Sequence, residues 1–158
     1  MKNTYLDLIQ QTFYFPQDGF EVKNNYLYFN GIPLKQLIEE YETPMRITYL
    51  PKISENIQRA KKYFNDAIRK LNYPGTYNYC YCTKSSHFAH VLVEALKNDI
   101  YLETSSAFDI DIIERLYLNK MLNKDTLIVC NGFKTKIYTD SIISLIKDRF
   151  NHVTPVLD

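Results

Sequence analysis

Glycine and cysteine are scarce in this chain of 158 residues, and tryptophan is absent, with 4 Gly, 3 Cys and no Trp. So few glycines leave little room for a glycine-rich phosphate-binding loop, and the sequence contains none. An odd number of cysteines does not make a disulfide framework. The sequence therefore favours a reducing, cytoplasmic setting.

Blocks of one charge and long apolar runs are also missing. The chain has 19 Lys+Arg against 18 Asp+Glu, a net charge of +1, whereas partners of nucleic acids and anionic membranes usually carry a basic excess. No window approaches the roughly 18 apolar residues of a membrane span, and the N-terminus does not resemble a signal peptide. We expect a cytoplasmic protein with no nucleic-acid or membrane partner.

Residues 1–44 differ in pattern from the rest and form a lead-in segment. Two short aromatic and β-branched runs in "GFEVKNNYLYFNGIP" are separated by Asn24 and Asn25, which predicts a β-hairpin, with Asn30-Gly31 as a following turn. Pro33 fits the first turn of a short helix, "PLKQLIEEY", that ends before Thr43-Pro44.

From Met45 onward, short apolar runs alternate with longer segments of helical periodicity. The predicted strands are 45–50, 77–83, 100–105, 126–131 and 153–158. The first helical segment carries one apolar stripe, formed by Ile53, Ile57, Ala60, Phe64, Ile68 and Leu71. Residues 45–158 thus predict an α/β fold of about four parallel βα units plus a fifth strand. Ser106 with Asp109 resembles a capping box for the helix after the strand at 100–105. Ser86 could cap the helix after the strand at 77–83.

Two architectures fit this alternation. A complete (β/α)8 barrel takes about 250 residues, so residues 45–158 would be the first half of a TIM-type barrel. A five-stranded, doubly wound open sheet would instead be complete at this length. The pattern alone does not separate the two.

Lys84, in "YCYCTKSSH", is the main candidate for chemistry. Side chains alternate along a strand, which places Cys80, Cys82 and Lys84 on one face and the tyrosines on the other. The cysteine face is small enough for the inside of a barrel, and Lys84 lies at the carboxyl end of the strand, where α/β sites are built. Desolvation there favours the neutral amine, a nucleophile toward aldehydes. The alternative is that Lys84 extends to solvent as an ordinary strand-end lysine.

Glu103 and Asn131 occupy the same strand-end position in the next two units. Either residue could belong to the site or be an ordinary polar group at the end of a strand. The spacing does not decide between these readings.

Two further groups are weaker candidates. Cys80 and Cys82 lack a second cysteine pair, so core packing is favoured over metal or redox chemistry. On a helix, His87, His90 and Glu94 would share one face, but their spacing matches no zinc signature, so solvated or capping roles are favoured and no metal site is predicted.

The segments "YCYCTKSSHFAHVLVEAL", "IYLETSSAFDIDIIERL" and "LIVCNGFKTKIYTDSI" resemble, in this order, the N-terminal part of the biosynthetic arginine decarboxylase family. The lead-in "TFYFPQDGFEVKNNYLYFNGIPL" is similar to that family's entry segment, and the resemblance runs to "VTPVLD". "CNGFK" and "LETSSAFDI" are specific when combined with a strand-end lysine. Members of the family have an alanine-racemase-like barrel.

The resemblance implies that Lys84 binds pyridoxal 5'-phosphate covalently as a Schiff base, with Glu103 near the cofactor and Asn131 at the mouth of the site. It implies conversion of arginine to agmatine and carbon dioxide in polyamine biosynthesis, by a homo-oligomer at full length. Relatives often carry asparagine where this chain has Ser86, so a polar contact made there could differ.

The family's phosphate-binding loop and C-terminal domain come later in its chains, so the resemblance implies that this chain is a fragment and inactive alone. A relative that decarboxylates ornithine, lysine or diaminopimelate is an alternative. The competing class is a non-catalytic α/β binding module.

Overall fold

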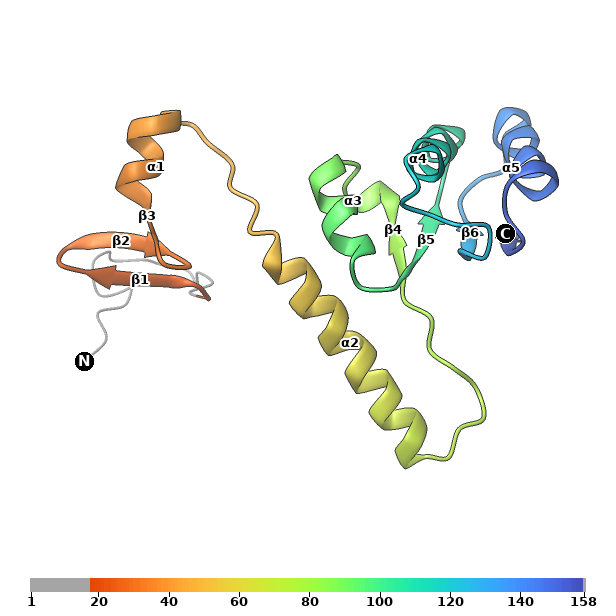
Figure 1. Cartoon of the computed structure of the whole chain (residues 1–158), viewed down its shortest axis with the longest axis horizontal. Coiled ribbons are helices and arrows are strands. Elements are labelled where there is room, and N and C mark those ends of the chain that lie inside the picture. The colour runs from red at the N-terminus through yellow and green to blue at the C-terminus, as the bar shows by residue number, and fades with distance from the viewer. Residues whose placement is uncertain (1–17, 158) are drawn as a thin grey trace. The chain divides into compact units, whose positions relative to one another are not determined.

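The computed structural model describes residues 18–157. The described residues form two compact units, 18–48 and 49–157, which are coloured in chain order in Figure 1. Residues 1–17 of the lead-in segment and Asp158 at the end of "VTPVLD" lie outside the described residues.

The first unit contains the predicted hairpin. Strands β1 (Phe20–Lys23) and β2 (Tyr26–Phe29) pair antiparallel. Asn24 and Asn25 join them with φ of 50° and 63°, the left-handed geometry of a type I′ turn. The hairpin prediction is therefore confirmed.

A short third strand, β3 (Ile32–Pro33), pairs with β2 and leads into helix α1 (Leu34–Tyr41). The sequence predicted this helix but not the strand. Pro33 precedes the helix as its N-cap residue rather than lying in its first turn.

The second unit begins with helix α2 (Pro51–Lys70), which confirms the predicted helix but not the strand before it. Residues 45–50 form no strand, and Ile47 is 45% exposed. A strand needs a neighbour for its backbone hydrogen bonds, and residues 45–50 pair with none of the described strands. The prediction of a strand at 45–50 was wrong.

Four short parallel strands form the sheet of the second unit. Their order is sequential: β4 (Cys80–Cys82), β5 (Tyr101–Thr104), β6 (Ile128–Cys130) and β7 (Val153–Pro155). Helices α3 (Ala89–Leu96), α4 (Ala107–Leu118) and α5 (Lys136–Asp148) connect them. The described residues thus contain three βα units and a fourth strand, one unit fewer than predicted.

The strand order bears on the two predicted architectures. A doubly wound sheet reverses its order at a switch point and carries helices on both faces. Here every neighbour in the sheet is the next strand in the sequence, and Leu102, Ile128 and Cys130 are buried in one core with residues of α4 and α5. The parallel sheet is compatible with part of an α/β barrel.

The other face of the sheet is only partly buried. Burial alternates along β5, where Leu102 and Thr104 are buried and Tyr101 and Glu103 are half-buried. We call the face that carries Glu103 the open face. The predicted faces of β4 are confirmed, because Tyr81 packs against the core while Cys82 contacts Glu103 on the open face.

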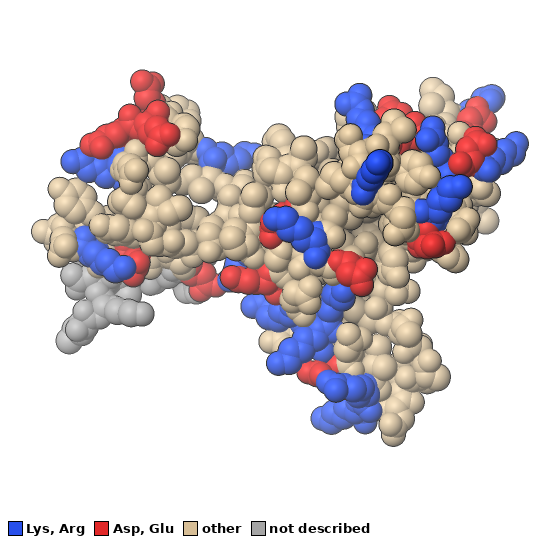
Figure 2. Space-filling model, in the orientation of Figure 1, with Lys and Arg blue, Asp and Glu red and all other residues tan. Residues whose placement is uncertain are grey.

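None of the helices among residues 18–157 is long and apolar enough to cross a membrane. On the surface, Lys and Arg are accompanied by Asp and Glu, as the side chains along α2 illustrate (Figure 2).

Candidate functional site

Polar side chains gather where β4, β5 and β6 reach their carboxyl ends. The amide of Asn131 donates from Nδ2 to Oε1 of Glu103 at 3.2 Å, and the thiol of Cys82 contacts the same oxygen at 3.6 Å. Parallel pairing places Cys82 directly beside Glu103, so strand register alone brings these groups together. The structure therefore joins two of the three predicted site residues, Glu103 and Asn131, in one contact.

Lys84 lies in the same region but in a different local structure from the one predicted. Strand β4 ends at Cys82, and Lys84 sits in a 3-10 turn, Thr83–Ser85, with its side chain exposed. The alternation of faces therefore stops before Lys84, and the expectation that Lys84 continues the inward row was wrong. Among the described residues, the Lys84 ammonium makes no hydrogen bond or ion pair.

The Cys82 thiol is the neighbour that Lys84 and Glu103 share. Burial raises the pKa of Cys82, the Glu103 carboxylate raises it further, and the charge of Lys84 opposes both. A thiol with a raised pKa stays protonated, so it can donate to Glu103 but is a poor nucleophile. This favours Cys82 as a supporting contact of Glu103, whereas the sequence predicted that it packs in the core.

The loop after β6 is held against the end of β5 by a close backbone approach. Gly132 has φ of 78°, and a Cβ placed on it would lie 2.6 Å from the carbonyl oxygen of Ser105. The Gly132 N–H donates to Oδ1 of Asn131 at 2.8 Å, which fixes the amide so that its Nδ2 faces Glu103. Glycine at this position is thus what allows Asn131 to reach Glu103.

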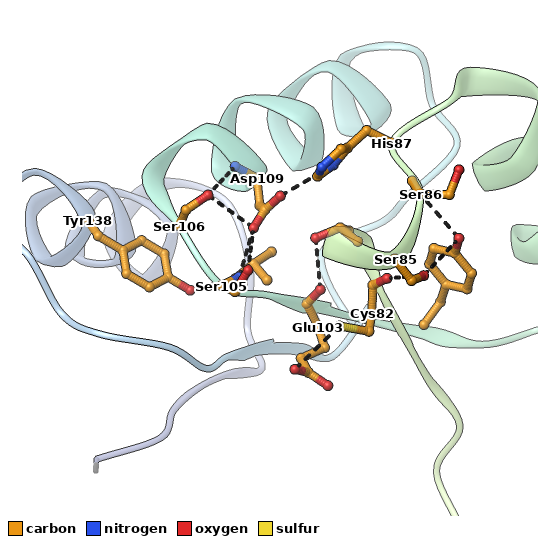
Figure 3. A network of polar contacts seen from close by, with 12 residues as sticks. Cys82, Ser85, Ser86, His87, Glu103, Ser105, Ser106, Asp109 and Tyr138 are labelled. Atoms are coloured by element: carbon orange, nitrogen blue, oxygen red, sulfur yellow. Dashed lines mark hydrogen bonds and ion pairs between the residues drawn. The ribbon is translucent and has the colours of Figure 1, made fainter.

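A second polar cluster surrounds Asp109 in the first turn of α4 (Figure 3). Its Oδ2 accepts hydrogen bonds from the Ser105 N–H at 2.8 Å, the Ser105 hydroxyl at 3.0 Å and the Ser106 hydroxyl at 3.1 Å. Ser106 is the N-cap residue and accepts from the Asp109 N–H. The N-cap half of the predicted capping box is confirmed, while the carboxylate accepts from the N–H of Ser105 instead of the N–H of the N-cap residue.

The ionised form of Asp109 is favoured in the folded protein. Burial alone raises the pKa of this carboxyl, but the hydrogen bonds from Ser105 and Ser106 outweigh it and hold the pKa below its ordinary value. The carboxylate also lies at the N-terminus of α4, where the helix dipole favours negative charge.

Asp109 should make stability depend on pH in the acid range. Because its folded-state pKa is depressed, its contribution is present above the unfolded pKa of about 3.9 and is lost as the pH falls through the folded value. We expect the difference in free energy of unfolding between wild type and Asp109→Asn to shrink below about pH 4. Urea titrations over this range measure it, and a constant difference would contradict the depressed pKa.

His87 does not share a helical face with His90 and Glu94. Helix α3 starts at Ala89 after the N-cap Phe88, without a side-chain cap, so His87 lies outside it and Ser86 does not cap it as predicted. The extended backbone of Ser86, with φ of −165°, separates the turn at Lys84 from α3 and explains both errors.

Each member of the predicted face has another neighbour. Nδ1 of His87 lies 3.5 Å from Oδ1 of Asp109, His90 stacks on Phe88, and Glu94 accepts from Ser54 and Lys97. No group of three potential metal ligands occurs among residues 18–157.

The pairing of His87 with Asp109 was not predicted. The sequence showed Asp109 only as a cap and His87 only as a helical ligand, because the two residues follow different strands. Their proximity comes from parallel register, which places the segment after β4 beside the segment after β5.

Comparison with known proteins gives one distant similarity. The chain is 29% identical over 113 residues to the biosynthetic arginine decarboxylase of Gloeobacter violaceus. The match covers 69% of this chain but spans only 17% of that protein's length. No family model matches the chain, and no solved structure matches it.

Proposed function

We propose that the chain is the part of a pyridoxal-phosphate-dependent amino-acid decarboxylase that carries the cofactor lysine, with arginine as the preferred substrate. The observation that carries this proposal is the position of Lys84. It is an exposed lysine without a hydrogen bond or ion pair among the described residues, at the carboxyl end of β4 and next to the strand that carries Glu103. The similarity to an arginine decarboxylase supports an enzyme of this kind.

The residues at this edge fit such a cofactor. A lysine that is not held in an ion pair can give up its proton and react with an aldehyde without first breaking that pair, and Lys84 meets that condition. Glu103, held by Asn131 and Cys82, provides a carboxylate on the open face, next to the end of the strand that leads into Lys84. When bound, pyridoxal phosphate supplies an electron sink for the bond broken at the substrate Cα.

The roles of the chain's own residues follow from their contacts. Lys84 provides the primary amine for covalent attachment. Glu103 is held in place by Asn131, so its carboxylate can accept a hydrogen bond or attract a positive charge without rearranging. Ornithine, lysine and diaminopimelate are the alternative substrates, and they differ from arginine at the far end of the side chain.

Borohydride trapping tests this proposal on the chain itself. Incubation with pyridoxal phosphate, reduction and peptide mapping should place most of the label on Lys84. Lys84→Arg should remove that label, because a guanidinium keeps the charge but forms no Schiff base.

Lys97→Arg is the matched control. Lys97 is also exposed but pairs with Glu94 at 2.7 Å, so its replacement should leave the labelling pattern unchanged. Label scattered over the surface lysines in wild type would contradict the proposal and favour a non-catalytic binding module.

A further inference from the structure

Asp109 has one buried oxygen that no hydrogen bond satisfies. The side chain is 1% exposed, and while Oδ2 accepts three hydrogen bonds, Oδ1 is the only buried side-chain nitrogen or oxygen among residues 18–157 without a partner. An ionised oxygen left alone in the interior is costly. Oδ1 is therefore available to accept a hydrogen bond from a neighbouring donor.

That neighbour is the imidazole of His87. Its Nδ1 lies 3.5 Å from Oδ1, and its ring packs edge-on against Phe108, with centroids 5.8 Å apart and planes at 88°. Figure 3 shows the ring of His87 directed toward Asp109. The His87 side chain is 44% exposed while the carboxylate is buried, so the pair joins an inaccessible anion to an accessible imidazole.

We propose that Asp109 is a positioning residue that holds His87 with its proton on Nδ1, so that Nε2 accepts a proton from the ammonium group of an amino-acid ligand. A neutral imidazole carries a proton on one ring nitrogen and a lone pair on the other. The hydrogen bond made by one nitrogen determines which of the two carries the proton. With Nδ1–H directed at Oδ1, the lone pair is on Nε2. The identity of the ligand rests on the proposed function, whereas the pair itself does not.

The proton transfer balances within these groups. An N–H bond of the ligand ammonium breaks, its electron pair stays on nitrogen, and a new N–H bond forms at Nε2. The ligand becomes a neutral amine able to attack a carbonyl or Schiff-base carbon, and His87 becomes an imidazolium ion. The adjacent Asp109 carboxylate compensates the charge that develops on the ring.

The contacts of Asp109 predict an opposite tautomer for one variant. In Asp109→Asn, the three donors from Ser105 and Ser106 hold the amide oxygen at the position of Oδ2. The amide NH2 then occupies the position of Oδ1 and donates to Nδ1 of His87. The imidazole proton must therefore move to Nε2.

Nitrogen-15 NMR of the histidine side chains in the full chain tests this inference. The spectrum is recorded near pH 8.5, about two units above the ordinary histidine pKa of about 6.5. His87→Gln assigns the His87 signals, and His90 is the internal control. We expect the proton of His87 on Nδ1 in wild type and on Nε2 in Asp109→Asn, with His90 unchanged.

The NMR outcomes show whether Asp109 holds the proton of His87 on Nδ1, and this test does not involve the cofactor. A wild-type proton on Nε2, or an imidazolium ion that persists at this pH, would overturn the inference, and neither reading needs the variant to fold. The same tautomer in wild type and folded Asp109→Asn would also overturn it.

A second measurement tests the role of Nε2. After pyridoxal phosphate is bound at Lys84, added arginine should displace it, and His87→Gln should slow that displacement by on the order of 100-fold. An unchanged rate would overturn the acceptor role. Failure of Lys84 to take up the cofactor would instead refute the proposed function and the ligand assignment, while the tautomer result would stand.

Discussion

Gly132→Ala is expected to lower the free energy of unfolding of the second unit by at least about 2 kcal/mol. The residue has φ of 78°, and its added Cβ would lie 2.6 Å from the backbone oxygen of Ser105. That oxygen belongs to the backbone directly after β5 and cannot move aside as a flexible side chain could. Urea unfolding at neutral pH measures the loss.

The steric contact with Ser105, more than the positive φ, is the reason that position 132 requires glycine. Asp99 and Lys120 in the same unit also have positive φ, at 50° and 58°, although neither is glycine. Lys120→Ala is therefore the control and should change stability by no more than about 0.5 kcal/mol. An equally small effect of Gly132→Ala would mean that the loop after β6 does not approach Ser105.

Asp109→Ala is expected to cost about 3 kcal/mol, because it leaves several donors without an acceptor at once. The Ser105 N–H and the hydroxyls of Ser105 and Ser106 all donate to Oδ2. Asp109→Asn should cost less, since the amide retains one oxygen for these donors. Denaturant unfolding of the two variants at neutral pH gives the comparison.

Asp111→Ala is the matched control on the same helix. Asp111 is exposed whereas Asp109 is buried, so its replacement should change stability within about 0.5 kcal/mol. Equal losses for Asp109→Ala and Asp111→Ala would show that the buried cluster contributes little to the fold.

The periodicity of the sequence predicted much of the second unit because apolar spacing responds directly to burial. It correctly assigned the two faces of β4, where tyrosine packs on the core and cysteine faces the open side. It failed at residues 45–50, which are apolar enough for a strand but have no paired neighbour among the described residues. Strand pairing depends on segments that are distant in the sequence, and the composition of one segment does not indicate whether such a partner is present.

The candidate site was predictable only in part for a related reason. Strand-end position indicated Glu103 and Asn131 as candidates, and the structure shows that their side chains contact each other. The alternation rule failed at Lys84 because the strand gives way to a turn one residue earlier. The His87–Asp109 pair depends on the direction that the chain takes after that turn. The spacing of residues along the sequence does not indicate this direction.

The sequential order of the strands also has a consequence for how the second unit assembles. Because each strand from β5 to β7 pairs with the strand made just before it, no pairing between these strands waits for a distant segment to be synthesised. Each pairing closes only the one helical connection between its two strands, and contacts between segments close in sequence favour rapid folding. Each βα unit can therefore dock on its predecessor as it leaves the ribosome, extending the sheet one strand at a time.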